Sequence, residues 1–179
     1  MTGNLPSSAR LLPAVFALAI CALLGNCIDS AQPVLTDAHP ILGDRLRFAL
    51  YALREGAAHD PITASFVWRN DRYVLTSGND EGFGDITIHP FEGQDLLVQS
   101  IRDRLPAEYA IARKLAAGVY LVVPIDETDA DASTRRRFCG AEKRLSCHVT
   151  VRAAIIAFAR ATASKQHPDG GLAVLLADQ

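Results

Sequence analysis

The stretch PITASFVWRNDRYVLTS, residues 61–77, decides the fold, because it has the pattern of a β-hairpin. Two runs rich in β-branched and aromatic residues flank Asn70 and Asp71, a pair suited to a tight turn. In the first run Phe66 and Trp68 fall on the same face of a strand, since side chains alternate along it. A connection this short makes the two strands antiparallel. We therefore predict an antiparallel hairpin here.

Two further hairpins follow the first, with their turns at residues 92–95 and 116–118. The predicted strands of all three hairpins are residues 61–68, 73–77, 86–90, 96–101, 109–113 and 119–123. About six consecutive antiparallel strands predict a meander, which forms one curved sheet or a partly open barrel. In the second hairpin Leu96 and Val98 point opposite to Leu97 and Gln99. One face of the sheet must therefore be covered by another element.

A C-terminal helix is predicted to provide that cover. From residue 151 onward, side chains suited to burial recur at helical spacing. They are Val151, Ala154, Ile155, Phe158, Ala159 and Thr162. Thr150 is a competent N-cap for this helix. A sheet of hairpins packed by a terminal helix belongs to the α+β class, and that is the predicted fold.

For two segments the sequence leaves the type of secondary structure open. In residues 44–53, Leu46, Phe48 and Leu50 alternate as in a strand, whereas Leu46, Leu50 and Leu53 share a helical face. Flanking glycines favour the strand. Residues 172–176 form either a last short strand or a packed tail.

A short helix is also predicted over residues 134–138, with Asp131 among the residues able to cap it. The acidic residues precede this helix and Arg135, Arg136 and Arg137 lie toward its C-terminal end, an order that complements the helix dipole. The first interpretation of the three arginines is a solvated helix face. The alternative is contact with acidic lipid or polysaccharide.

The first 26 residues have the layout of a bacterial export signal. Arg10 precedes an apolar run from Leu11 to Leu24, which is 14 residues long. A helix that spans a bilayer needs about 20 residues, so this run suits a signal-peptide core. The sequence therefore predicts an exported protein.

The signal ends in Leu24-Gly25-Asn26-Cys27, which resembles the lipobox of bacterial lipoproteins. The resemblance implies that Cys27 becomes the acylated N-terminus, attached to the membrane and facing the periplasm. Because Ile28 rather than an aspartate follows Cys27, the resemblance favours the outer membrane. Two alternatives stay open, which are secretion after cleavage near Ser30 and an uncleaved N-terminal anchor.

Residues 27–40 are predicted to be the lipidated N-terminus and a tether, because prolines and polar residues interrupt any regular pattern. Residues 41–179 then form a single globular domain, a length that suits one core. The order of signal, cysteine, tether, hairpins, cysteine pair and helix resembles small lipoproteins of Gram-negative bacteria. That resemblance implies no particular activity.

Two cysteines remain in the exported part, Cys139 and Cys147. An even pair in an oxidising compartment predicts a disulfide, which would stabilise the fold by about 2–3 kcal/mol. The alternative is a zinc site with the neighbouring His148, but no fourth ligand stands at a recognisable spacing. We therefore predict no metal and no other cofactor.

Candidate catalytic residues are scattered along the chain. His59, His89 and His148 lie in different contexts, and no Gly-x-Ser-x-Gly elbow occurs. The formal net charge of −2 gives no basis for binding nucleic acid. We expect a non-enzymatic envelope module, held by its lipid anchor, whose partner is an envelope protein or a polysaccharide. The alternative is a small hydrolase with a site assembled from hairpin loops.

Overall fold

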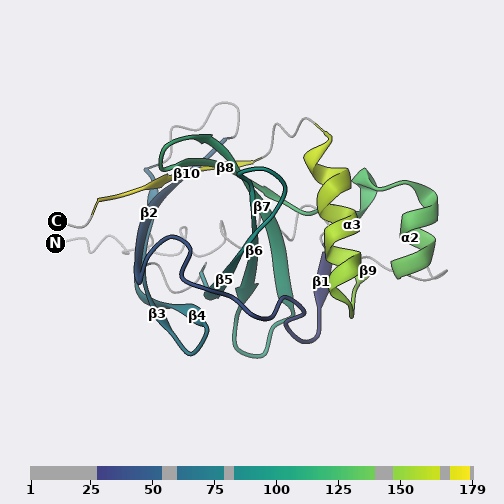
Figure 1. Ribbon diagram of the computed structural model, residues 1–179, viewed down its shortest axis with the longest axis horizontal. Coiled ribbons are helices and arrows are strands. Elements are labelled where there is room, and N and C mark those ends of the chain that lie inside the picture. Colours follow the sequence, from purple (N-terminus) through teal and green to yellow (C-terminus); the bar gives the residue numbers. More distant parts are fainter. Residues whose placement is uncertain (1–27, 54–59, 79–82, 140–146, 166–169, 178–179) are drawn as a thin grey trace, which may run out of the picture.

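Eight antiparallel strands close into a barrel, and a helical layer lies against one side of it (Figure 1). The structure is a computed structural model, and it describes residues 28–53, 60–78, 83–139, 147–165 and 170–177. The barrel strands are β2 (Arg45–Ala52), β3 (Ile62–Arg69), β4 (Arg72–Gly78), β5 (Asp85–Pro90), β6 (Leu96–Ile101), β7 (Ala107–Ala116), β8 (Val119–Pro124) and β10 (Gly171–Leu175). The remaining elements are β1 (Ile28–Ser30), η1 (Glu127–Asp129), α2 (Ala132–Cys139), β9 (Cys147–His148) and α3 (Arg152–Ala163).

All three predicted hairpins are confirmed, as the pairs β3/β4, β5/β6 and β7/β8. At the turn between β3 and β4, Asn70 and Asp71 both have positive φ values, 51° and 59°. That is the backbone of the two-residue turn whose twist matches antiparallel strands, and it is adopted most readily by Asn, Asp and Gly. Gly118, with φ 70°, performs the same role between β7 and β8.

The prediction of about six strands was too low, because the described residues contain ten. The ambiguous segment near residue 48 is strand β2, and the C-terminal segment is strand β10. β10 lies between β2 and β8 and is antiparallel to both, while β6 also pairs with β7. These pairings close the sheet into a barrel rather than leaving it open. Periodicity could not show this, because the segments that pair are distant in sequence.

The helix α3 covers the outer face of the barrel at β7, as the prediction of a covering helix requires (Figure 1). Its buried residues are Ala154, Ile155, Phe158, Ala159 and Thr162. The predicted start was wrong by one residue: Val151 is the N-cap, without a side-chain hydrogen bond, and its side chain is 48 % exposed. The chain is extended at Val151, so the apolar spacing includes one residue too many.

The predicted tether packs against the barrel over its described part. Ile28, Leu35 and Ala38 are all buried, and Ile28 belongs to strand β1, which is antiparallel to β7 and parallel to β9. The expectation of a free spacer after residue 27 was therefore wrong, because these side chains complete the core beneath α3. The predicted signal and the lipidation residue Cys27 lie outside the described residues.

The predicted short helix is confirmed as α2. The Asp131 carboxylate accepts hydrogen bonds from the backbone N–H groups of Ser133 and Thr134, at 2.7 Å and 2.8 Å. A hydrogen bond from the Ser133 hydroxyl to the same carboxylate, together with these two bonds, holds the pKa of Asp131 down at about 2, because all of them favour the charged carboxylate. Neither α2 nor α3, the α-helices in the described part of the chain, has the length and apolar character needed to cross a membrane.

Candidate functional site

The two faces of strand β6 have different surroundings, and this difference locates the candidate site. Leu97 and Gln99 point outward beneath the covering layer, with 1 % and 0 % of their surface exposed. Leu96 and Val98 point into the barrel and are only partly buried. Val98 lies in the middle of the barrel wall, between Ile88 of β5 and Ala110 of β7. Val98 is thus an inward side chain that stays partly exposed, although it packs against the apolar clusters of the interior.

Large aromatic side chains line the interior on the side of β2, β3 and β4. Phe48 stacks on Phe66, with ring centroids 5.6 Å apart, and the Phe83 ring meets both edge to face. Trp68 contacts Tyr73 across the hairpin, with 5.0 Å between the ring centroids. The predicted common face of Phe66 and Trp68 is thus the inner face of the barrel.

Alanines of β7 and β10, together with the buried Tyr120 of β8, line the opposite side of the interior. Ala110 and Ala112 of β7 face inward, because they pair directly with the inward residues Val98 and Leu96. Ala173 of β10 packs in the same apolar cluster as Ala112. Eight-stranded barrels have an interior that side chains just fill or that holds one small ligand. Alanines facing an aromatic wall, with partly exposed residues between them, favour the second case.

The rim of the barrel carries exposed apolar residues where β2 ends and β3 begins. Leu53 is 42 % exposed and Ile62 is 39 % exposed. Ile62 pairs with the inward residue Leu50, so this rim continues the apolar lining of the interior.

Tyr73 closes the opposite end of the aromatic wall. Its hydroxyl donates a hydrogen bond to the carbonyl oxygen of Gly43 at 2.9 Å and accepts one from the N–H of Leu42 at 3.2 Å. Burial raises the pKa of Tyr73, since it disfavours the phenolate. The hydroxyl is thus fixed by the chain that leads into β2, and the interior keeps an apolar lining beside it.

A buried polar cluster lies on the outer face, beneath the N-terminal segment. The Gln99 side chain accepts hydrogen bonds from the N–H groups of Val34 and Leu35 and donates to the Leu35 carbonyl oxygen, at 3.0, 3.0 and 3.2 Å. It also donates to the Thr87 hydroxyl, which lies 3.1 Å from Nε2 of His89. This cluster holds the N-terminal segment against the barrel.

His89 does not have the surroundings of a catalytic base. It is 3 % exposed, and burial lowers its pKa; the positive charge of Arg152 lowers it further. Its described hydrogen-bond partner is Thr87, which in turn is bonded to Gln99. The imidazole is therefore neutral near pH 7 and belongs to the packing of the outer layer.

His148 contacts the carboxylate of Asp29 through its Nδ1 atom. Ser30 follows Asp29, but its hydroxyl lies 2.5 Å from the Tyr109 hydroxyl and donates to the carbonyl oxygen of Gln32. Within the described part of the chain, His148 therefore has no hydroxyl or thiol partner that would complete a nucleophilic triad. His59 lies outside the described residues.

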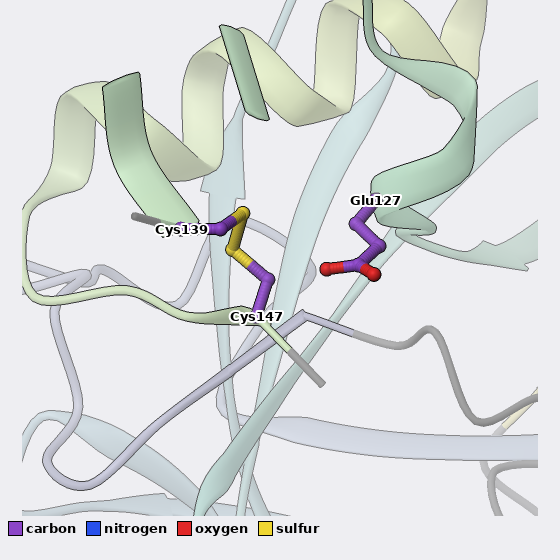
Figure 2. A group of neighbouring side chains, drawn as sticks. All are labelled: Glu127, Cys139 and Cys147. Atoms are coloured by element: carbon purple, nitrogen blue, oxygen red, sulfur yellow. A yellow bond between two sulfur atoms is a disulfide. The ribbon is translucent and has the colours of Figure 1, made fainter. Parts of the chain in front are cut away.

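The predicted cysteine pair is joined: a disulfide links Cys139, at the end of α2, to Cys147 of β9 (Figure 2). The Glu127 carboxylate points toward it, and one ligand atom from each of these three residues lies within 4.8 Å of the others (Figure 2). Burial raises the pKa of Glu127. Sulfurs bonded to each other are not thiolates, so this group is not a zinc site while the disulfide is intact. His148, the other zinc ligand considered, is paired with Asp29 instead.

Comparison with other proteins found no similarity that bears on this site: no family model matches the chain, and no curated protein or solved structure matches it either.

The barrel interior is a candidate site that the sequence alone did not reveal. The alternation at Leu96, Leu97, Val98 and Gln99 showed that β6 has two faces. Only closure of the barrel identifies which face encloses a space.

Proposed function

We propose that this protein is a non-enzymatic binding module of the bacterial cell envelope, anchored through acylated Cys27, and that its barrel interior binds one small, uncharged, apolar molecule. The observation that carries the binding proposal is the partial exposure of Val98. Partial exposure of an inward side chain in the middle of a closed wall supports an interior that its own side chains do not completely fill. The predicted envelope proteins and polysaccharides remain partners for the outer surface.

The chemistry of the lining supports an apolar ligand. Phe48, Phe66 and Trp68 provide flat apolar surface, and Ala110 and Ala112 leave room opposite them. Burial of apolar surface contributes about 25 cal/mol for each Å² removed from water. Since a charged group would lose its hydration without a partner on these walls, the interior selects against ionised ligands.

The chain contains one tryptophan, Trp68, and this makes binding measurable. An apolar dye whose absorption overlaps tryptophan emission should quench Trp68 saturably when it enters the barrel. Unlabelled apolar molecules should then compete with the dye. A wild-type protein that binds no such dye saturably would contradict a ligand-binding interior.

A filling substitution provides the sharper test, with a matched control on the other face of the sheet. Val98→Phe should weaken dye binding at least about tenfold and leave the melting temperature nearly unchanged, because the added ring occupies open space. Val67→Phe is the control, since Val67 is also partly buried but faces outward in β3. If the interior is filled by side chains, Val98→Phe should instead cost about 1–3 kcal/mol of stability. That result would refute the proposal.

The anchor is tested separately by metabolic labelling with a fatty-acid probe. Wild-type protein should be labelled, and the Cys27→Ser variant should not, because the thioether forms on the Cys27 sulfur. An unlabelled wild-type protein released in soluble form would show that the lipoprotein proposal is wrong. The binding proposal does not depend on this result.

A further inference from the structure

The C-terminal half of helix α2 is basic and exposed. Arg135, Arg136 and Arg137 are all exposed, and none of them forms an ion pair with another side chain in the part of the chain that the structure describes. The Arg137 guanidinium lies 5.0 Å from the centre of the Phe138 ring, which holds it along the helix. Three exposed guanidinium groups within one helical turn favour an anionic partner.

The helix is connected to the start of β1 by two short links. The disulfide places the Cα atoms of Cys139 and Cys147 5.0 Å apart. Cys147 is the register partner of Ile28 in the parallel pair of β9 and β1. In the sequence, Cys27 directly precedes Ile28. The Cα atoms of the arginines are thus within about 16 Å of that of Ile28 along this path.

Burial and backbone hydrogen bonds fix these links. Ile28 is completely buried, and its N–H donates to the carbonyl oxygen of Ile125 at 3.2 Å. Val149, two residues after Cys147, donates to the carbonyl oxygen of Asp29 at 2.8 Å. An acyl chain on Cys27 would therefore hold this side of the domain directly at the membrane surface, because no flexible spacer follows the cysteine.

We propose that the arginines of α2 bind the anionic phospholipid headgroups of the leaflet that holds the Cys27 acyl chains. The proposal rests on the proposed lipoprotein anchor. Guanidinium groups donate two parallel hydrogen bonds to phosphate oxygens, so they suit this partner better than a zwitterionic surface does. The acidic residues Asp126 and Asp131 precede α2, whereas the arginines lie toward its Cys139 end and hence toward the anchor. The domain would then have a fixed orientation on the membrane.

The orientation can be measured by arginine modification with phenylglyoxal. The full chain is expressed with its own signal in a Gram-negative host and purified in detergent. It is then reconstituted into vesicles of phosphatidylcholine, with or without phosphatidylglycerol. Mass spectrometry follows the modification of Arg135, Arg136 and Arg137. Arg69, exposed at the β3–β4 turn of the barrel, is the internal control.

Modification of the three arginines should be about fivefold slower in vesicles that contain phosphatidylglycerol, the factor that corresponds to ~1 kcal/mol per basic residue near an anionic surface. Arg69 should react equally in both vesicles. Protection should disappear in about 1 M salt, where the Debye length is about 3 Å. Equal modification in both kinds of vesicle would overturn the proposal. Fatty-acid labelling of the same sample separates the two failures, since an unlabelled chain refutes the anchor and a labelled but unprotected one refutes only the orientation.

Discussion

The same six residues form the inner and the outer face of β6, yet the side chains on the two faces have different surroundings. The outward side chains, Leu97 and Gln99, are in contact with the layer formed by α3 and the N-terminal segment. The inward side chains, Leu96 and Val98, are partly open to solvent. In ordinary barrels the interior is the core. Here a second buried core lies outside the barrel, beneath α3 and the N-terminal segment, in addition to the inward cluster around Phe66 and Tyr73.

This difference explains why the N-terminal segment and α3 both pack on β7. Ile28, Ile155 and Phe158 are completely buried there, together with Ile125 of the chain after β8. Each fully buried side chain of this size contributes about 1.5–3 kcal/mol. The outer core thus stabilises the fold in addition to the buried cluster of the barrel interior.

Replacing one aromatic residue of the outer core and one of the barrel interior with alanine should give the largest difference in unfolding free energy between the two regions. Phe158→Ala removes a fully buried ring of the outer core and should cost about 3–5 kcal/mol of unfolding free energy. Phe48→Ala removes an inward, partly exposed ring and should cost only about 1–2 kcal/mol, because water already reaches its surroundings. Chemical denaturation measures both. Equal losses would show that the interior is packed as tightly as the outer core.

Gln99→Leu tests how the outer face holds the N-terminal segment. The substitution leaves the backbone groups of Leu35 without their side-chain partner, at a cost of about 1–3 kcal/mol. Amide hydrogen exchange of Val34 and Leu35 should accelerate at the same time. Gln94→Leu, at an exposed position in the β5–β6 turn, is the matched control and should change neither quantity. Unchanged exchange at Leu35 in Gln99→Leu would mean that apolar packing alone holds the segment.

His89 should give the smallest effect, a pH dependence of stability. Its pKa is lowered in the fold, chiefly by burial, so the unfolded chain takes up the proton first as the pH falls through about 6.5. Arg152 and His39 also lower this pKa, and Asp37 raises it. Stability should therefore decrease below about pH 6.5, and His89→Gln should reduce this slope. Thermal unfolding at several pH values measures it, and a slope identical in the variant would assign the effect to other groups.

Much of the fold could be predicted because its signals are local. The Asn70-Asp71 turn, the alternation around Trp68 and the helical spacing around Phe158 each lie within a short stretch of sequence. The pairing of Cys139 with Cys147 followed from their number and the inferred compartment. The predictions that were wrong concerned segments with weak periodicity, such as the short β1. The position of β1 depends on partners far along the chain.

The candidate site was harder to predict for the same reason. Val98 and Leu97 are both apolar, and nothing in their order says which one faces a closed interior. Gln99 appeared as one polar residue in an apolar strand, and its role became visible only when Leu35, distant in sequence, was found beside it. A polar residue in a strand with an otherwise buried face is the one sequence signal that could have indicated this contact.

By itself the sequence determined the hairpins, the stripe of the C-terminal helix and the cysteine pair, because turns and side-chain periodicity act between near neighbours. It also contains the segment predicted to be an export signal and Cys27, on which the predicted location depends. Only the tertiary structure decided that β2 and β10 close the barrel and that Ile28 begins the outer core. Such pairings depend on bringing distant segments together, and their free energy is gained only when the whole sheet has formed.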